Sequence, residues 1–331
     1  MPRASLSVGL LSTHSSGVQK KYLNTSVGRP YAFISPAIFR VRTSECTATK
    51  QLFLLTTQHY TGITFAGAIH NNTIVGYVGL LPCYWNLSTQ EFTILPRGEY
   101  TNGTAISITD NIIVGQVDTY PCYWNTETNL LTELVYDSYS GGTARAVNNG
   151  TIVGQVDTLP CYWNLEYNLL TILDNGIYTS GIANDIDNGT IVGKVESVPC
   201  RWNLSTNTLS LLTLTGYSTG EAFSIHGNII VGQVGVSPCY WNLSNQLFLL
   251  PYEGYTSGIG SDVHNNIIVG YVVKNNIPTA CYWDSDRNLH LLSLTVNSTT
   301  YILSIATSIH NNTICGVVLN DTSIRACYWV I

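Results

Sequence analysis

Four histidines occupy corresponding places in the chain, each directly before a short turn sequence. They are His70, His226, His264 and His310, and the same place in three other segments holds Thr109, Asn148 and Asp187. Imidazole titrates near neutral pH and is a common metal ligand. A ring of four metal-binding histidines and a set of polar residues beside turns both account for this column. We favour the second, because three segments lack histidine, and we expect no metal and no cofactor.

A column of tyrosines is the best candidate for ligand binding. Each is followed by Ser or Thr and usually then by Gly, as in "YTNGTA", "YSGGTA" and "YTSGIA". An aromatic plane beside hydroxyl groups suits a sugar ring, which stacks its C–H face and forms hydrogen bonds at its edge. The alternative is that tyrosine closes the contact between neighbouring repeats. The column consists of Tyr60, Tyr100, Tyr139, Tyr178, Tyr217, Tyr255 and Tyr301.

Cysteine forms a third column, two residues before tryptophan in seven places. No Cys-x2-Cys zinc spacing occurs, so we interpret these cysteines as buried free thiols that act as small apolar fillers. Cys315 replaces a valine and is expected to do the same. Cys46 leaves an alternative open, because a Cys46–Cys327 disulfide would lie where the two ends of the chain meet.

Catalytic motifs are missing from the sequence. Acidic residues are few and scattered, and there is no Gly-x-Ser-x-Gly, phosphate-binding loop or paired-histidine zinc motif. Nucleic-acid binding would depend on the basic N-terminal segment alone, since the remainder of the chain is acidic. We therefore expect neither an enzyme nor a nucleic-acid-binding protein.

The elements that carry these columns form a repeat. All seven tryptophans recur at spacings of 39, 39, 39, 39, 42 and 46 residues. Each repeat contains four short strand-like segments, typified by "TAISI", "TIVGQV", "PCYWN" and "NLLTIL", and no sustained helical period. A small residue is kept in the first segment, which suggests crowding near the axis of a ring. Four strands in about 40 residues indicate a blade of a β-propeller. The sequence therefore predicts an all-β, seven-bladed propeller.

The two ends of the repeat region predict how the ring closes. The last repeat stops at "ACYWVI", after its third strand, whereas "KQLFLL" (residues 50–55) matches a fourth strand. Pairing these two segments would remove the exposed edges of an open array. The turn between the first two strands carries Asn, Asp or Gly in every repeat, the residue types that tolerate positive φ in a two-residue hairpin.

The repeat resembles the bacterial HAF-repeat proteins, in which a "His-Ala-Phe-Leu-Trp" strand accompanies an "Ile-Asn-Asn-x-Gly-x-Val-Val-Gly" hairpin. The counterparts here are "PCYWN" and "HNNTIVG", over about residues 44–331. The closure is similar to that of WD-repeat propellers. The resemblance implies a propeller, and for HAF-repeat proteins an extracellular place, but no activity.

Charge divides the chain into two regions. Residues 1–50 hold seven of the 14 basic residues and one acid, a net charge of +6, whereas the remainder carries −12. We expect a basic N-terminal arm at residues 1–43 and the propeller at 44–331. Such an arm could bind the acidic body of the next copy, or it could be a solvated leader. No apolar run is long enough to span a bilayer, and no clear signal peptide is present.

Eleven Asn-x-Ser/Thr sequons fall in expected turns and loops, where acceptors of N-linked glycans lie. The alternative is that turns simply favour asparagine. The sequons begin at Asn24, Asn71, Asn86, Asn102, Asn149, Asn188, Asn203, Asn242, Asn297, Asn311 and Asn320.

Charged residues make up only 10% of the chain, so glycans would account for its solubility. The sequence therefore favours a non-enzymatic structural protein of an extracellular assembly, such as a filament, a cell-surface layer or a virion surface. Such a protein would associate with itself through the basic arm. The alternative is a multivalent, lectin-like propeller that binds glycans through the tyrosine segments.

Overall fold

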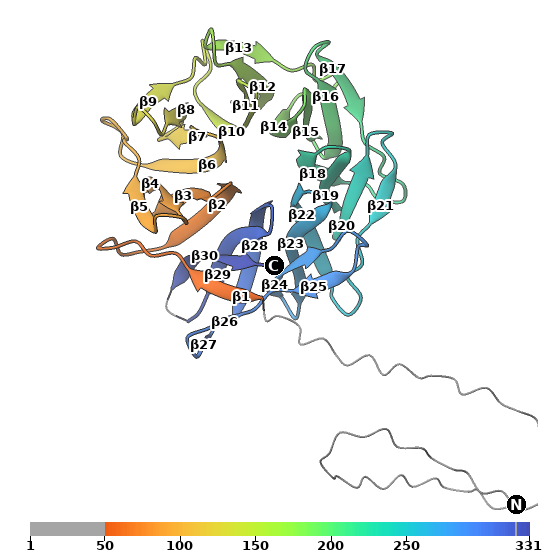
Figure 1. Ribbon diagram of the computed structural model, residues 1–331. Coiled ribbons are helices and arrows are strands. Elements are labelled where there is room, and N and C mark those ends of the chain that lie inside the picture. Colours follow the sequence, from red (N-terminus) through yellow and green to blue (C-terminus); the bar gives the residue numbers. More distant parts are fainter. Residues whose placement is uncertain (1–49, 322) are drawn as a thin grey trace, which may run out of the picture. The chain divides into compact units, whose positions relative to one another are not determined.

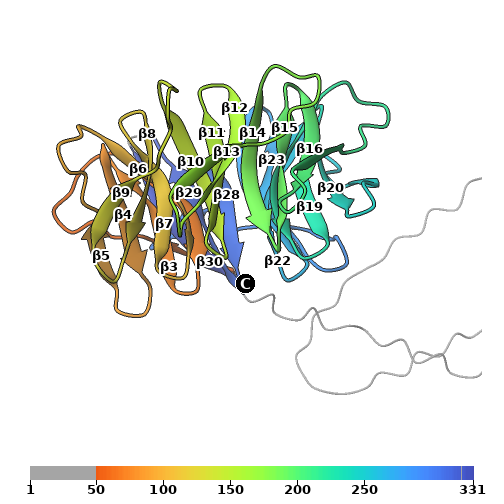
Figure 2. The ribbon, with the colours of Figure 1, turned by 90° about the horizontal axis from the view of Figure 1, so that it is seen from above.

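The computed structural model describes residues 50–321 and 323–331. Seven four-stranded antiparallel sheets surround a central axis as the blades of a β-propeller (Figure 1). Turned by 90°, the blades stand side by side with their turns along two opposite faces (Figure 2). The described residues contain no helix, and therefore none that could cross a membrane. The predicted seven-bladed fold is confirmed, whereas the predicted boundary at residues 43/44 lies outside the described residues.

Each blade runs from a first strand at the axis to a fourth strand at the rim. The first strands are β2 (Thr64–His70), β6 (Gly103–Thr109), β10 (Gly142–Asn148), β14 (Gly181–Asp187), β18 (Gly220–His226), β22 (Ser257–His264) and β28 (Leu303–His310). The second strands are β3 (Thr73–Val78), β7 (Ile112–Val117), β11 (Thr151–Val156), β15 (Thr190–Val195), β19 (Ile229–Val234), β23 (Ile267–Lys274) and β29 (Thr313–Leu319).

The outer half of each blade repeats in the same way. The third strands are β4 (Leu81–Asn86), β8 (Tyr120–Asn125), β12 (Leu159–Asn164), β16 (Val198–Asn203), β20 (Ser237–Asn242), β24 (Ile277–Trp283) and β30 (Ile324–Val330). The fourth strands are β5 (Glu91–Ile94), β9 (Leu130–Glu133), β13 (Leu169–Ile172), β17 (Thr208–Leu211), β21 (Leu247–Leu249), β25 (Leu289–Leu291) and β1 (Gln51–Leu54). A small hairpin of β26 (Thr295–Val296) and β27 (Thr299–Thr300) precedes the seventh blade. Blades 1 to 7 are numbered here from β2 to β28.

The ring closes as the sequence predicts. Strand β1 pairs antiparallel with β30, with Leu52 opposite Trp329 and Leu54 opposite Cys327. An N-terminal strand therefore completes the C-terminal blade, and the edge that β30 would otherwise expose is covered.

Tryptophan and cysteine lie on the buried side of every third strand, as the alternation predicts. Six of the seven tryptophans are fully buried, and Trp85 is 3% exposed. Each indole Nε1 donates a hydrogen bond of 2.6–2.8 Å to a carbonyl in the segment that follows the fourth strand of the preceding blade. Each tryptophan therefore fills its own blade and fastens it to the one before.

The small residue of the first strand contributes to the same core. Ala66 and its counterparts are 0–1% exposed and pack between blades, so the crowding expected near the axis occurs in the inter-blade core. The pairing register shifts directly after each of them, for example between Ala183 and Asp185. Opposite this bulge, the glycine of "TIVG" allows close backbone approach, because a Cβ on Gly193 would lie 1.9 Å from the carbonyl oxygen of Ile182.

The meander defines two faces. We call "hairpin face" the side with the turns between first and second strands and between third and fourth strands. We call "loop face" the side with the turns between second and third strands and the segments that join successive blades. On the hairpin face, backbone bonds such as Leu165 N–H to Gly150 O link the two kinds of turn. On the loop face, bonds such as Gly181 N–H to Thr158 O link neighbouring blades.

Candidate functional site

The seven tyrosines of the candidate binding column lie on the loop face, in the segments between blades. Tyr301 is buried, and five others are half-buried against the apolar core of a blade. Tyr60 is the most open, at 43% exposed. In six of the seven, as in Tyr139, the backbone N–H closes a turn on the carbonyl three residues earlier, whereas Tyr301 N–H donates to Leu294 O. These contacts favour the interpretation that tyrosine closes the contact between blades.

Several hydroxyl groups beside these tyrosines already have acceptors. Thr101 Oγ1 donates to Asp118 Oδ1 at 2.7 Å, Ser140 Oγ to Asp157 Oδ1 at 2.6 Å, and Thr179 Oγ1 to Glu196 Oε1 at 3.1 Å. The carboxylates come from the turn between the second and third strands of the same blade. A sugar would have to compete with these bonds, so the repeated Tyr-Ser/Thr motif has a local structural use in blades 2 to 4.

The histidine column forms part of a ring at the mouth of the central channel, on the hairpin face. We call these seven residues, one from each first strand, the mouth ring: His70, Thr109, Asn148, Asp187, His226, His264 and His310. The four imidazoles come from blades 5, 6, 7 and 1, with successive ring centroids 4.5, 4.5 and 4.7 Å apart. Each histidine ends the first strand of its blade, so the arrangement of the blades around the axis brings the four side chains together.

Mouth-ring side chains fasten several blades to the next. Asn311 N–H donates to His264 Nδ1 at 3.0 Å, and Asn71 N–H donates to His310 Nδ1 at 3.1 Å. In blade 4 the acceptor is Asp187, which receives Gly227 N–H at 2.7 Å. An Nδ1 atom that accepts a hydrogen bond carries no proton, so the neutral forms of His264 and His310 are Nε2–H tautomers.

Proton binding would break these contacts. Burial foremost, together with the neighbouring His310, His226 and His70 and against a smaller opposing effect of Asp187, lowers the pKa of His264 to about 4. Burial, together with His70 and His226, also lowers the pKa of His310. The ring is therefore suited to neutral imidazoles. In the described part of the chain, no three His, Cys, Asp or Glu residues are placed to hold a metal ion.

Deeper in the channel lies a second ring, which the sequence alone did not reveal. We call it the middle ring; it consists of Ala68, Ser107, Ala146, Asp185, Ser224, Asp262 and Ser308. In the four consecutive blades from β14 to β28 the ring is polar, with Asp185, Ser224, Asp262 and Ser308. This position of the repeat holds alanine, serine or aspartate, so no residue type recurs in every blade. A search for repeated residue types therefore does not find it.

Ser224 bridges the two carboxyl groups of the middle ring. Its Oγ lies 2.8 Å from Asp185 Oδ2 and 2.6 Å from Asp262 Oδ1. The same carboxyl groups accept backbone N–H groups of the next blade, Ile225 at 2.9 Å for Asp185 and Ile309 at 2.8 Å for Asp262. The middle ring therefore fastens blades 4, 5, 6 and 7 around the channel.

The bridge holds a proton. A serine hydroxyl has one hydrogen to donate, so it can satisfy only one of two ionised carboxylates. When one carboxyl group is protonated, it can donate to Ser224 while Ser224 donates to the other, and both contacts are then satisfied. Burial and the charge of Asp262 raise the pKa of Asp185 to about 7, and burial raises the pKa of Asp262. We assign the shared hydrogen to Asp185.

The channel also holds a half-buried arginine. Arg145 lies in β10 one residue before the middle ring, beside Asn184 of β14, and its Nε is buried with no partner among the described residues. Burial lowers the pKa of Arg145, and Glu221 opposes that shift. Glu221 itself pairs with Lys194 at 2.6 Å. The channel has cavities of about 250 Å³ at the mouth ring and about 180 Å³ beside Arg145.

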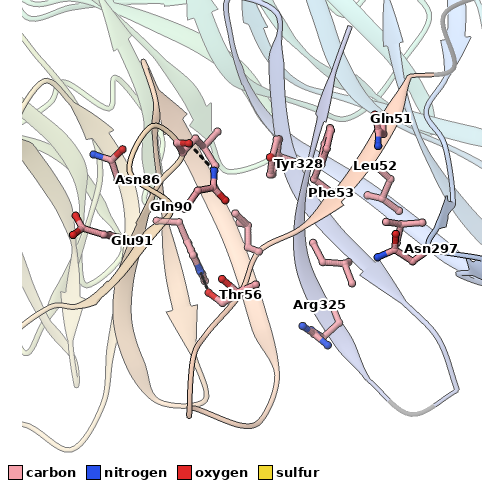
Figure 3. Close-up of a pocket in the computed structure, with 15 residues that line it drawn as sticks. Gln51, Leu52, Phe53, Thr56, Asn86, Gln90, Glu91, Asn297, Arg325 and Tyr328 are labelled. Carbon is pink, nitrogen blue, oxygen red and sulfur yellow. Dashed lines mark hydrogen bonds between the residues drawn. The ribbon is translucent and has the colours of Figure 1, made fainter.

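A larger groove of about 460 Å³ lies where the ring closes, between blades 7 and 1 (Figure 3). Strand β1 forms one wall, with Phe53 stacked on Tyr328 at a centroid distance of 4.8 Å. Glu91, Asn297 and Arg325 also line it.

A side-chain bridge found at another blade junction is missing beside this groove. In blade 3, Asn168 bridges the outer strand of blade 2, with its Nδ2 donating to Glu133 O and its Oδ1 accepting Val135 N–H, each at 3.2 Å. Gln90 holds the corresponding place in blade 1 but donates to Leu87 O of its own turn at 2.7 Å.

The sequon asparagines are all at the surface, apart from Asn24, which lies outside the described residues. None of the other ten is buried. Seven lie in turns or at strand ends of the hairpin face, and Asn102, Asn297 and Asn320 lie on the loop face. The hairpin-face group consists of Asn71, Asn86, Asn149, Asn188, Asn203, Asn242 and Asn311.

The cysteine column consists of buried free thiols, as expected. Cys83, Cys122, Cys161, Cys200, Cys239, Cys281, Cys315 and Cys327 are fully buried and unpaired. Burial raises the pKa of Cys315 to about 12, which keeps the thiol protonated and unreactive. Cys46 lies outside the described residues.

Comparisons with known proteins reveal the fold and no family. No family model and no curated protein sequence matches the chain. Virginiamycin B lyase from Staphylococcus aureus superimposes with a TM-score of 0.62 at 8% sequence identity, over 85% of this chain and 99% of that one. The extracellular domain of a putative one-component system from B. thetaiotaomicron gives 0.56 at 11%, over 83% of this chain. The match spans 39% of that longer chain. At such identities the likeness extends to the propeller fold, and the HAF-repeat resemblance stays an interpretation.

Proposed function

We propose that this chain is a non-enzymatic structural protein of an extracellular assembly, such as a filament, a cell-surface layer or a virion surface. In this proposal the propeller carries N-linked glycans, and copies associate through the basic segment 1–43. The fold supports a rigid, repetitive body, because tryptophan, the mouth ring and the middle ring all fasten neighbouring blades.

The observation that carries the proposal is the placement of the sequons. All ten described acceptor asparagines are at the surface, and seven share one face. At Asn86 and Asn203 the side-chain Oδ1 accepts backbone N–H groups two and three residues later. Each Nδ2, the atom that would carry a glycan, is therefore held at the end of a strand on the hairpin face. With only 10% charged residues, such glycans would supply the solubility that charge does not.

The intact mass of the protein tests directly whether the sequons carry glycans. The bare chain is 36.3 kDa, and protein from its natural source should exceed this by several sugar chains and return to it on deglycosylation. Asn188→Gln should remove one glycan. Asn265→Gln is the matched control, because Asn265 has the same exposed turn position and a similar φ, 48° against 46°, but begins no sequon. A sharp mass of the bare chain would overturn the glycosylated, extracellular assignment.

Association through the basic segment has its own test. Deletion of residues 1–35, which removes four of the seven basic residues of the N-terminal region, should abolish higher assembly in sedimentation experiments. A truncated protein that still polymerises would show that residues 1–35 are not needed for the contact.

Carbohydrate binding through the tyrosine segments is the alternative function. It requires Tyr139 and Tyr178 to present their rings, although both pack against blade cores. A glycan array with wild-type protein and with Tyr139→Ala/Tyr178→Ala decides it. Binding that is lost in the double variant, with the fold intact, would establish the alternative, and a blank array would exclude it.

A further inference from the structure

The two faces of the propeller differ in apolar exposure. Of the large apolar side chains that are exposed, seven lie in the turns and connecting segments of the loop face, among them Ile177 (92% exposed), Leu80 (65%) and Val236 (57%). In the turns of the hairpin face the described residues include one, Tyr167. An excess of exposed apolar groups on one of two faces favours that face as the surface that binds another protein.

The loop face is the more acidic of the two, since the described turns of the hairpin face hold five acidic residues and one basic residue, Arg287. The described turns and connecting segments of the loop face contain eight acidic residues and a single basic one, Arg97. The acids come from blades 2, 3, 4, 6 and 7, and Glu99, Asp137 and Asp174 lie in segments between blades. A partner of this face therefore needs basic residues interspersed with apolar ones.

Such a segment is present in the same chain. Residues 29–42 read "RPYAFISPAIFRVR", with Arg29, Arg40 and Arg42, several large apolar residues and no acid. Apolar groups and positive charge in this stretch match the exposed apolar groups and carboxylates of the loop face. The hairpin face offers few apolar partners and holds seven of the ten described sequons, whose glycans would cover it.

We propose that the loop face of one propeller is the docking surface for the basic segment 29–42 of a second copy. This inference rests on the proposed function for its self-association, and it adds which face and which segment make the contact. It predicts a polar, head-to-tail assembly, because segment and face are different surfaces. Such heterologous contacts form rings or open filaments.

The test uses the full-length chain with variants of equal change on the two faces. Leu80→Ser/Ile177→Ser and Glu99→Gln/Asp137→Asn alter the loop face. Tyr167→Ser/Leu130→Ser and Glu127→Gln/Glu166→Gln are controls on or beside the hairpin face, at residues that are likewise exposed. Sedimentation should show each loop-face pair weakening self-association by about tenfold or more, the effect of losing one or two interface anchors, with the controls unchanged.

A synthetic peptide of residues 29–42 gives a second readout. Labelled peptide should bind the full-length chain, compete with self-association and lose affinity in the loop-face variants. Raising salt from about 0.05 M to about 0.5 M should weaken it. If the chain self-associates but only the hairpin-face variants disrupt it, or if the peptide does not bind, this inference is wrong and the structural function stands. A chain that stays monomeric would overturn both.

Discussion

Replacing Asp185 with asparagine tests whether the middle ring holds a proton. In the folded protein, burial and Asp262 raise the pKa of Asp185 to about 7 from an ordinary value of 3.8. The folded state therefore keeps a proton that the unfolded chain releases between these values. Because the folded state binds more protons, the contribution of Asp185 to the free energy of unfolding falls as pH rises from about 4 to about 7. The full shift corresponds to about 4 kcal/mol.

His264 acts in the opposite direction. Its folded-state pKa is lowered from 6.5 to about 4, so the unfolded chain binds a proton that the folded protein does not. Its contribution to the free energy of unfolding therefore rises with pH across nearly the same window, by about 3 kcal/mol in total. The two slopes nearly cancel, and we expect the stability of the wild-type protein to show little dependence on these two groups between about pH 4 and pH 6.5.

Asp185→Asn removes one side of this balance. Urea unfolding at about pH 4.5 and about pH 6.5 should show that the variant gains about 2–3 kcal/mol more than wild type on going to the higher pH, because the slope of His264 is no longer opposed. The variant also loses an acceptor for Ile186 or Ile225, but this loss is the same at both pH values and does not enter the difference. Glu166→Gln, at an exposed turn, is the control. Parallel pH profiles for wild type and Asp185→Asn would refute the shared proton.

Three further predictions concern the same fold. His264→Asn should have the opposite pH effect to Asp185→Asn, so that the stability of the variant falls as pH rises from about 4 to about 6.5, as measured by the same urea titrations. Gly193→Ala should destabilise by more than about 3 kcal/mol or prevent folding, because its Cβ would lie 1.9 Å from the carbonyl oxygen of Ile182; circular dichroism melting measures this, and a wild-type Tm would contradict the close approach. Trp163→Phe should cost about 2–3 kcal/mol, since it leaves a void and removes the 2.6 Å hydrogen bond to Val135 O; a loss under 1 kcal/mol in denaturant unfolding would show that the indole N–H does not fasten the blades.

The repeated parts of the fold could be predicted because each repeat reports the same packing requirement independently. The Trp column gave the number of blades, the alternation of Cys, Tyr and Trp gave the buried side of the third strand, and the unmatched strand at residues 50–55 gave the closure. Each position of the repeat occurs seven times, so a requirement of the fold can be told from local variation within one sequence. The hairpin turns followed in the same way, since Asn71, Asp110, Asn149 and Asn188 adopt positive φ as their residue types suggest.

The channel could not be predicted by the same reasoning. Asp185, Ser224 and Asp262 interact across blades that lie 38 and 39 residues apart, and their column also holds alanine. Packing requires a residue in every repeat, whereas a hydrogen-bonded bridge requires complementary partners in adjacent repeats only. The informative signal was therefore the departure from the repeat: acids at a place where other blades carry Ala or Ser.

The same distinction applies to the two faces. Repetition identifies residues that hold the propeller together. Most of these already make contacts within the protein, as the half-buried tyrosines and the hydrogen bonds of Thr101 and Ser140 illustrate. Contacts with another molecule are more readily made by exposed side chains that differ from blade to blade, such as Leu80, Ile177 and Val236, whose positions hold other residues in other blades. A partner that recognises this uneven pattern binds in one orientation about the ring axis, whereas a partner of the repeated residues could bind in seven. The uneven loop face is for this reason the better place to look for specific assembly.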